Sequence, residues 1–245
     1  MIENLCEDNE ITNFREVCMG TISRGVLYRG AYPFLEADHE RNKVYEHLAA
    51  NANISCVLNL GDNESGLARI AGLAPWYRKL LERKKIIGLD MQFAFGQDFQ
   101  TERYGTFKNK LKQGLQFLMA HNGPYLIHCH AGIDRTGFVA AVLQALLGAN
   151  LSQIVYDYLL SHGKKVVENQ DAHLATGSII LNQLDTILDG KVYDKSNFQS
   201  NIEGYLLKEL GLTLRELDML VGRLNSSSFS SNAVGTATYG ENYDI

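Results

Sequence analysis

The segment that most constrains the fold of this chain runs from Pro124 to Gly137 and reads PYLIHCHAGIDRTG. A short apolar run, Tyr125–His128, leads into Cys129, and after five further residues Arg135 opens an apolar helix. A loop between the end of a strand and the start of a helix directs successive backbone N–H groups at one point, where the helix dipole adds positive potential. The segment therefore predicts a strand–loop–helix unit that binds an anion.

Strands alternate with helices in the first two-thirds of the chain, which predicts an α/β domain: a central, largely parallel sheet flanked by helices. Short apolar runs rich in β-branched residues are typical of strands buried on both faces. The predicted strands are Val26–Tyr28, Ile54–Leu60, Ile86–Met91 and Tyr125–His128. The predicted helices are Glu36–Asn51, Pro75–Lys85, Arg103–Asn122, Arg135–Leu147, Ser152–His162, Asp171–Leu188, Phe198–Leu210 and Thr213–Leu224. The helices after His128 are expected to cover one side of the sheet.

The chain is long and apolar enough to bury one sizeable core, because it has 245 residues, of which 45% are hydrophobic and 21% are charged. Its one clear change in composition comes after Leu224, where the Ser-rich stretch NSSSFSSN begins and helical periodicity ends. We therefore expect residues 1–224 to form a single folded domain and residues 225–245 to be a disordered tail.

The charge balance and the cysteines limit the class of function. Acidic side chains outnumber basic ones by 28 to 23, and the formal net charge of −5 argues against a nucleic-acid partner. The four cysteines are too few and too scattered for a disulfide framework, and their spacing does not fit a zinc site. A reducing compartment is therefore the simplest expectation.

Neither end of the chain nor its apolar stretches predict a membrane protein. The N-terminal MIENLCEDNE has no apolar core and is not expected to act as a secretory signal peptide. The most apolar stretch, Phe138–Leu151, is shorter than the roughly 20 residues that cross a bilayer. We expect a soluble, cytoplasmic protein without a membrane span, and export by a route without a cleaved signal stays open.

Cys129 and Arg135 supply the chemistry that the loop predicts. The positive potential that binds phosphate also stabilises a thiolate, and it lowers a cysteine pKa from about 8.5 to roughly 3.5–7.5 in such settings. A thiolate beneath a bound phosphoryl group is an in-line nucleophile, so we expect a cysteinyl-phosphate intermediate. Arg135 offers a planar fork to two phosphate oxygens. This reaction is expected to need no metal and no cofactor.

The neighbours of Cys129 are expected to support it. Gly132 lets the backbone approach the anion closely, and the small Ala131 leaves room for it. The Thr136 hydroxyl is expected to hydrogen-bond the sulfur, and His128 to orient the loop through backbone contacts rather than to act as a base. The phosphate, or a sulfate ion in its place, is expected to lie against His130, Ala131, Gly132, Ile133, Asp134 and Arg135.

The sequence HCHAGIDRTG resembles the P-loop of the cysteine-dependent phosphatases, and within them the bacterial tyrosine and dual-specificity group, whose loop usually reads HC-x-AGKDRTG. Four further segments are similar to segments of the same group: NFREV and GVLYRGAYP near the N-terminus, YDYLLS after the loop, and IEGYLLKELGLTLRELDML near the C-terminus. The resemblance extends from roughly Ile11 to Leu224 and implies a protein tyrosine phosphatase-like fold, with residues 1–224 as the catalytic domain.

The resemblance implies that Cys129 is the nucleophile, that Arg135 clamps the phosphate, and that Asp134 takes part in catalysis. It also implies a phosphorylated protein or peptide as substrate, with phosphotyrosine first and phosphoserine and phosphothreonine as further candidates. The loop lysine of this group is associated with acceptance of phosphoinositides, and in this chain Ile133 replaces that lysine. This replacement and the net charge of −5 favour a singly phosphorylated protein; an inositol phosphate or phosphoinositide stays the alternative.

Two aspartates are candidates for the general acid that protonates the leaving oxygen, a step worth about 10²–10⁴-fold in rate. Asp134 lies in the loop itself. Asp98, in the segment FAFGQDFQTE, precedes Cys129 by 31 residues, which is close to the separation in related dual-specificity phosphatases. Asp98 is equally consistent with an exposed loop carboxylate or a helix cap. Asp90 is a weaker third candidate.

Further residues receive plain structural interpretations: a loop turn for Asn59–Asp62 and Glu64, ion pairs for Arg15 and Arg29, packing for Trp76 and Tyr77, a solvated helix end for Lys164 and Lys165, and a core position for Cys56. A phosphate-binding module without turnover is disfavoured, because the chain keeps Cys129, Arg135 and Thr136. Low-molecular-weight phosphatases and arsenate reductases are disfavoured as well, because their cysteine lies near the N-terminus.

Overall fold

The computed structural model describes residues 11–92, 102–163, 166–167 and 169–226. A five-stranded sheet lies at its centre, with the strand order β1-β2-β5-β3-β4. Four of these strands run parallel, and the short edge strand β1 pairs antiparallel with β2. The strands are β1 Arg15–Glu16, β2 Leu27–Gly30, β3 Cys56–Asn59, β4 Ile86–Gly88 and β5 Tyr125–His128. The predicted α/β class is therefore confirmed.

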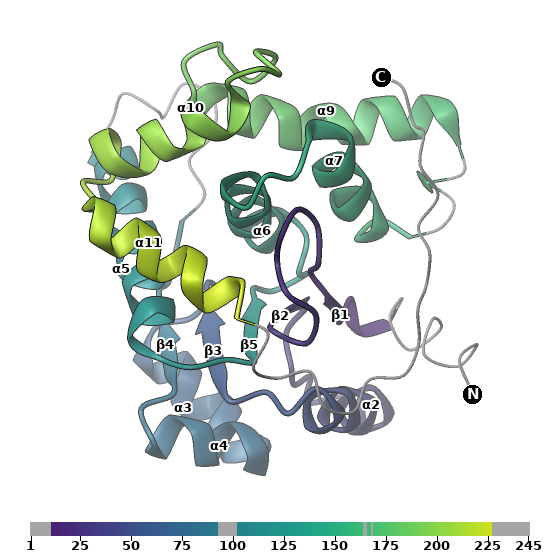
Figure 1. The fold of residues 1–245 in the computed structure, drawn as a ribbon. Coiled ribbons are helices and arrows are strands. Elements are labelled where there is room, and N and C mark those ends of the chain that lie inside the picture. Colours follow the sequence, from purple (N-terminus) through teal and green to yellow (C-terminus); the bar gives the residue numbers. More distant parts are fainter. Residues whose placement is uncertain (1–10, 93–101, 164–165, 168, 227–245) are drawn as a thin grey trace.

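Helices cover both faces of the sheet (Figure 1). On one face lie α2 (His39–Asn51), α3 (Glu64–Leu73) and α4 (Pro75–Glu82), which share the smaller apolar core. The larger core lies on the other face, against α5 (Glu102–Ala120), α6 (Asp134–Leu146), α7 (Leu151–Leu160), α9 (Gln170–Ile187), α10 (Phe198–Gly204) and α11 (Leu214–Leu224). All the residues of β3 and β5 are buried, as expected for strands covered on both faces.

The central strand β5 lies between β2 and β3 and is parallel to both. Gly30 at the end of β2 and Asn59 at the end of β3 both pair with His128 at the end of β5. Because the three strands end at the same level, the loops that follow them meet at one edge of the sheet. Ligand sites in open α/β sheets lie at this carboxyl edge.

The structure corrects the sequence-based prediction in three places. Residues after Asn59 were expected to form only a turn, but α3 follows at Glu64, with Asn63 as its N-cap. Two glycines weaken its helix propensity, and packing of Leu67, Ile70 and Ala71 into the smaller core stabilises it instead. The antiparallel strand β1 was not predicted. The single helix expected over 198–210 is divided into α10 and a π-helical turn, η2 (Tyr205–Glu209).

The predicted domain boundary stays a prediction. Helix α11 ends at Leu224, where the sequence pattern placed the end of the domain, but the residues 227–245 of the expected tail lie outside the described residues. In the described part of the chain, each helix is too short or too polar to cross a membrane.

Candidate active site

Cys129 directly follows β5 at the carboxyl edge of the sheet, with only 3% of its surface exposed. The chain then turns through residues 130–133 into α6, which begins at Asp134. Gly132 makes this turn with a φ of +74°, and a Cβ at this position would lie 2.5 Å from the carbonyl oxygen of Gly30. Only glycine tolerates both the positive φ and the close approach, as the sequence pattern predicted.

The N-terminus of α6 has no side-chain cap. Its N-cap residue is Ile133, whose side chain cannot accept a hydrogen bond, whereas α3, α7 and α11 each have a capping Asn or Thr. The first N–H groups of a helix need an acceptor from outside the helix, and the helix dipole favours an anion there. The start of α6, which follows Cys129 by five residues, is therefore a position where an anion can bind.

Arg135 is half-buried on the first turn of α6. Its Nη1 donates a hydrogen bond to the carbonyl oxygen of Met91, 3.2 Å away, just beyond β4. A Cβ on Gly61, in the loop after β3, would lie 3.7 Å from both Arg135 Nη1 and Cys129 Cα. The loops after β3, β4 and β5 therefore meet near Cys129, and within the described residues Arg135 makes one hydrogen bond, to Met91 O.

Residues distant in sequence hold the loop from behind. Asn13 Nδ2 lies 3.2 Å from the carbonyl oxygens of both Ala131 and Gly132. Arg29 Nη2 donates to Gly132 O at 2.9 Å and to Ile133 O at 3.4 Å. Because these carbonyl groups point toward Asn13 and Arg29, the N–H groups of the loop are free to face the opposite side, where an anion would bind.

Asp157 on α7 fixes this support. Its carboxylate accepts from Arg15 Nε at 3.0 Å, from Arg29 Nη1 at 2.6 Å and from Gln144 Nε2 at 2.9 Å. Burial alone would raise the pKa of Asp157, but the charges of Arg15 and Arg29 outweigh burial and lower it to about 2. The same burial, together with Arg29, lowers the pKa of Arg15 to about 10. The network is therefore ionised at neutral pH.

A model of the tyrosine phosphatase family matches residues 9–226. The chain belongs to this family. The turn from Cys129 to Arg135, which joins β5 to α6, is the segment that resembles the phosphatase loop of this family, and it is called the phosphatase loop below. Family membership confirms the resemblance and the tyrosine phosphatase-like fold expected from the sequence. The family consists of phosphoric monoester hydrolases, which agrees with the class of enzyme predicted from the loop.

Two curated relatives match parts of the chain. The triple specificity protein phosphatase PtpB of Mycobacterium tuberculosis is 30% identical over 133 residues, which cover 51% of this chain and 47% of PtpB. A putative tyrosine-protein phosphatase of Cupriavidus necator is 39% identical over 77 residues, 30% of this chain and 28% of that protein. The chain thus matches about half of PtpB and less of the second relative.

Two solved structures of the Siw14 catalytic core are also similar. The core of the PP-IP phosphatase SIW14 from S. cerevisiae, in complex with citrate, has a TM-score of 0.40 and 18% identity, covering 67% of this chain and 83% of that chain. The second structure has a TM-score of 0.41 and 18% identity, and the match covers 75% of this chain and 96% of that chain.

His128, the residue before Cys129, is fully buried beneath the phosphatase loop. Its Nδ1 lies 3.4 Å from the carbonyl oxygen of Cys129, and its Nε2 lies 3.3 Å from the Tyr77 hydroxyl. Asn59 Nδ2 donates to that hydroxyl oxygen at 3.1 Å, so the Tyr77 proton is free to donate to Nε2. Burial lowers the pKa of His128 to about 4, so the ring is neutral at pH 7 and contacts the backbone at Cys129; that it orients the loop stays a prediction.

Of the two main candidates for the general acid, Asp134 lies within the described residues. Asp134, the first residue of α6, is exposed, and its Oδ1 accepts a hydrogen bond from the Tyr158 hydroxyl at 3.2 Å. Asp98 lies outside the described residues. Asp90, the third candidate, follows β4, and its backbone oxygen accepts from Lys110 at 2.6 Å. The hydrogen bond from Tyr158 gives the Asp134 carboxylate a defined position at the start of α6.

One expected contact is not formed. The Thr136 hydroxyl is buried and has no hydrogen-bond partner among the described residues, so the predicted bond to the Cys129 sulfur is absent from this structure. Thr136 lies on the first turn of α6, where its position is fixed by the helix. Of the expected phosphate contacts, His130 and Ala131 are exposed, and Ile133 is half-buried against the larger core.

The plain structural interpretations hold for most of the other residues. Asn59 Oδ1 accepts from the N–H groups of Gly61 and Asp62, which makes the expected turn at the end of β3. Arg15 and Arg29 form ion pairs with Asp157. Cys56 is buried in β3, and desolvation raises its pKa to about 12. Lys164 and Lys165 lie outside the described residues.

The sequence predicted ion pairs for Arg15 and Arg29 without their partner, and it did not predict that Asn13 and Asp157 support the loop, although their segments were noted. Asn13 and Arg15 come from NFREV, and Asp157 comes from YDYLLS. The signal was an acidic residue within an apolar helix, because a buried carboxylate needs a cationic partner. Which cation pairs with Asp157 depends on contacts across the fold, and the sequence pattern did not reveal it.

Proposed function

We propose that this chain is a protein tyrosine phosphatase that hydrolyses phosphomonoesters through a cysteinyl-phosphate intermediate. The observation that carries the proposal is the position of Cys129 beneath the uncapped start of α6, with Arg135 beside it, in a chain of this family. A cation and uncapped helix N–H groups near a cysteine stabilise both a thiolate and a phosphate dianion.

The reaction has two steps. The Cys129 thiolate attacks phosphorus, so the S–P bond forms while the P–O bond to the leaving group breaks, and an aspartic acid protonates the departing oxygen. Water then attacks phosphorus, its proton passes to the carboxylate, and phosphate leaves as the thiolate re-forms. Arg135 and the loop N–H groups stabilise charge on the three equatorial oxygens in both steps. The chemistry needs a free thiol, which a reducing compartment such as the cytoplasm provides.

The proposed substrate is a phosphorylated protein or peptide. Ile133 packs an apolar side chain at the loop, where the group's lysine would add positive charge, and the chain carries a net charge of −5. Both features favour a singly phosphorylated aromatic ester over a polyanion. The relative PtpB is named a triple specificity phosphatase, so phosphoserine, phosphothreonine and phosphoinositides belong in the test as the alternative substrates.

A panel of phosphorylated substrates tests the proposal with Cys129→Ser as the inactive control. We expect release of phosphate from phosphotyrosine peptides that vanadate inhibits and chelators do not, and its loss by about 10⁴-fold or more in Cys129→Ser. Cys56→Ala is the matched variant, because it removes another buried thiol, and it should keep its activity. Full turnover in Cys129→Ser would overturn the mechanism.

The pH dependence of kcat/KM assigns the general acid. A group that donates a proton in the rate-limiting step produces the basic limb of the profile, and its replacement by an amide removes that limb. We propose Asp134 or Asp98 for this role. Whichever of Asp134→Asn and Asp98→Asn keeps the basic limb is not the proton donor. Tyr158→Phe, which removes the hydrogen bond to Asp134, is expected to shift the limb only if Asp134 is the acid.

A further inference from the structure

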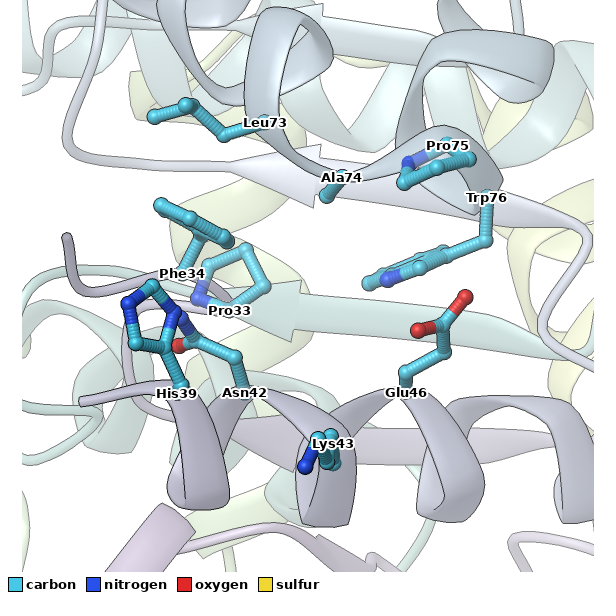
Figure 2. A pocket seen from close by; sticks show the side chains of 10 residues that line it. All are labelled: Pro33, Phe34, His39, Asn42, Lys43, Glu46, Leu73, Ala74, Pro75 and Trp76. Carbon is cyan, nitrogen blue, oxygen red and sulfur yellow. The ribbon is translucent and has the colours of Figure 1, made fainter.

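A pocket of about 170 Å³ lies between α2 and the junction of α3 with α4 (Figure 2). Apolar side chains form most of its wall, among them Phe34 before α2 and Trp76 on α4. Its polar side belongs to α2 and includes Lys43 and Glu46. Pockets for drug-sized ligands usually measure about 300–1,000 Å³, so this one suits a single amino-acid side chain.

Glu46 is the acidic group of the pocket. Its exposed carboxylate has no ion-pair partner within the described part of the chain. Lys43 belongs to the same lining, but its Nζ is paired with Glu40 at 2.9 Å. His39 is the other basic residue of the lining, and the α3–α4 junction contributes no charged side chain to it. Glu46 is therefore the carboxylate of the lining that is available to pair with a cation, since Lys43 pairs with Glu40 instead.

Trp76 presents a fixed aromatic face to the same space. Its ring stacks on Tyr45 with centroids 6.3 Å apart and meets the Tyr77 ring edge-on at 5.4 Å, so packing holds its orientation. Figure 2 shows the Glu46 side chain rising from α2 toward the indole, which extends from α4 into the pocket. An aromatic face beside a carboxylate attracts a cation, and Trp is the strongest of the aromatic side chains in this interaction.

The segment that leads into the pocket contacts the turn after Cys129. Tyr32 donates its backbone N–H to His130 O at 2.9 Å, and its ring lies 5.1 Å from that of His130. Phe34 follows Tyr32 by two residues, so their Cα atoms are at most about 7.6 Å apart, twice the 3.8 Å step between neighbours. An extended peptide rises about 3.3 Å per residue, so a substrate bound at the loop reaches the pocket within a few residues.

We propose that this pocket binds a lysine or arginine side chain of the phosphorylated protein substrate, a few residues from the phosphorylated tyrosine. The cationic head lies between the Trp76 face and the Glu46 carboxylate, and the aliphatic stem lies along the apolar wall. The acidic net charge of the chain, −5, favours the same kind of substrate. The inference rests on the proposed function and adds to it a preference for basic flanking sequence.

Binding of phosphotyrosine peptides to Cys129→Ser tests the inference without turnover. One lysine is moved through positions roughly two to five residues on either side of the phosphotyrosine and compared with norleucine, which has a similar stem and no charge. We expect lysine at one of these positions to tighten binding by about three- to tenfold, measured by fluorescence anisotropy. Glu46→Gln in the same background should remove this preference.

Glu82→Gln is the matched control, because Glu82 is exposed on α4 and does not line the pocket, and it should keep the preference. Equal affinity for the lysine and norleucine peptides at every position, or an unchanged preference in Glu46→Gln, would overturn the inference. Hydrolysis of para-nitrophenyl phosphate by the wild-type chain tests the proposed function separately, because that substrate has no peptide to reach the pocket.

Discussion

The arginines on the two sides of the phosphatase loop differ in whether a carboxylate neutralises their charge. Behind the loop, Arg29 is completely buried, pairs with Asp157 and donates to loop carbonyl groups. In front, Arg135 is half-buried, has no carboxylate partner within the described residues, and makes one hydrogen bond to the backbone at Met91. Both are arginines within reach of the same loop.

The difference shows how the fold separates support from binding. The charge of Arg29 is neutralised by Asp157 inside the protein, where an unpaired charge would be costly. Within the described residues, Arg135 has no counter-ion and the start of α6 has no side-chain cap, so an anion from outside can pair with both. A loop held on one side and open on the other is pre-organised for its ligand, which is the condition for strong electrostatic stabilisation of a transition state.

The largest expected effect comes from breaking the support side. Asp157→Asn places an amide N–H₂ against the donors of Arg15 and Arg29 and leaves two buried cations without a counter-ion. We expect the free energy of unfolding to fall by about 3–5 kcal/mol, measured by urea unfolding at pH 7. The exposed Asp218→Asn on α11 should change it by less than about 0.5 kcal/mol. A loss below about 1 kcal/mol in Asp157→Asn would contradict the support role.

Changing the open side should affect catalysis and spare stability. Arg135→Lys keeps the positive charge but loses the planar fork that binds two phosphate oxygens. We expect kcat/KM for a phosphotyrosine peptide to fall by about 10²–10³-fold and vanadate to bind more weakly, with the free energy of unfolding within about 0.5 kcal/mol of wild type. The exposed Arg215→Lys on α11 is the matched control. If Arg135→Lys instead lowers the free energy of unfolding as much as Asp157→Asn does, or binds vanadate as tightly as the wild type, the two sides of the loop do not differ as described.

The pH dependence of stability tests the burial of His128 beneath the phosphatase loop. Burial lowers its pKa from 6.5 to about 4, so between these values the unfolded chain takes up a proton that the folded chain does not. The stability due to this group is complete above pH 6.5 and is lost as the pH falls toward 4, by about 3 kcal/mol in total.

Urea unfolding at several pH values from 7 to 4 measures this contribution. In His128→Gln, the slope of unfolding free energy against pH in that window should decrease by up to about 1.4 kcal/mol per pH unit, the value for one proton. The exposed His47→Gln is the matched control, because it makes the same substitution at the surface. Identical slopes in wild type and His128→Gln would show that His128 is not neutral and buried in the folded protein.

The local features of the site could be predicted from sequence, because each depends on neighbouring residues. The strand Tyr125–His128, the turn at Gly132 and the helix after it follow from apolar runs, a required glycine and helix periodicity within one short segment. The identities of Cys129 and Arg135 follow from the same segment. The helix α3 was not predicted, because its two glycines lower its helix propensity and packing into the smaller core is what stabilises it.

By itself, the sequence determined the phosphatase loop and the α/β class, since local propensity and hydrophobic periodicity specify both. Only the tertiary structure decided what holds the loop. Arg29 and Asp157 are 128 residues apart, and Asn13 lies 119 residues before the Gly132 carbonyl to which it donates. No spacing rule connects residues so far apart; the parallel register of β2 with β5 and the packing of α7 bring them together. Pairing of buried charges is a property of the folded core, because burial is what makes an unpaired charge costly.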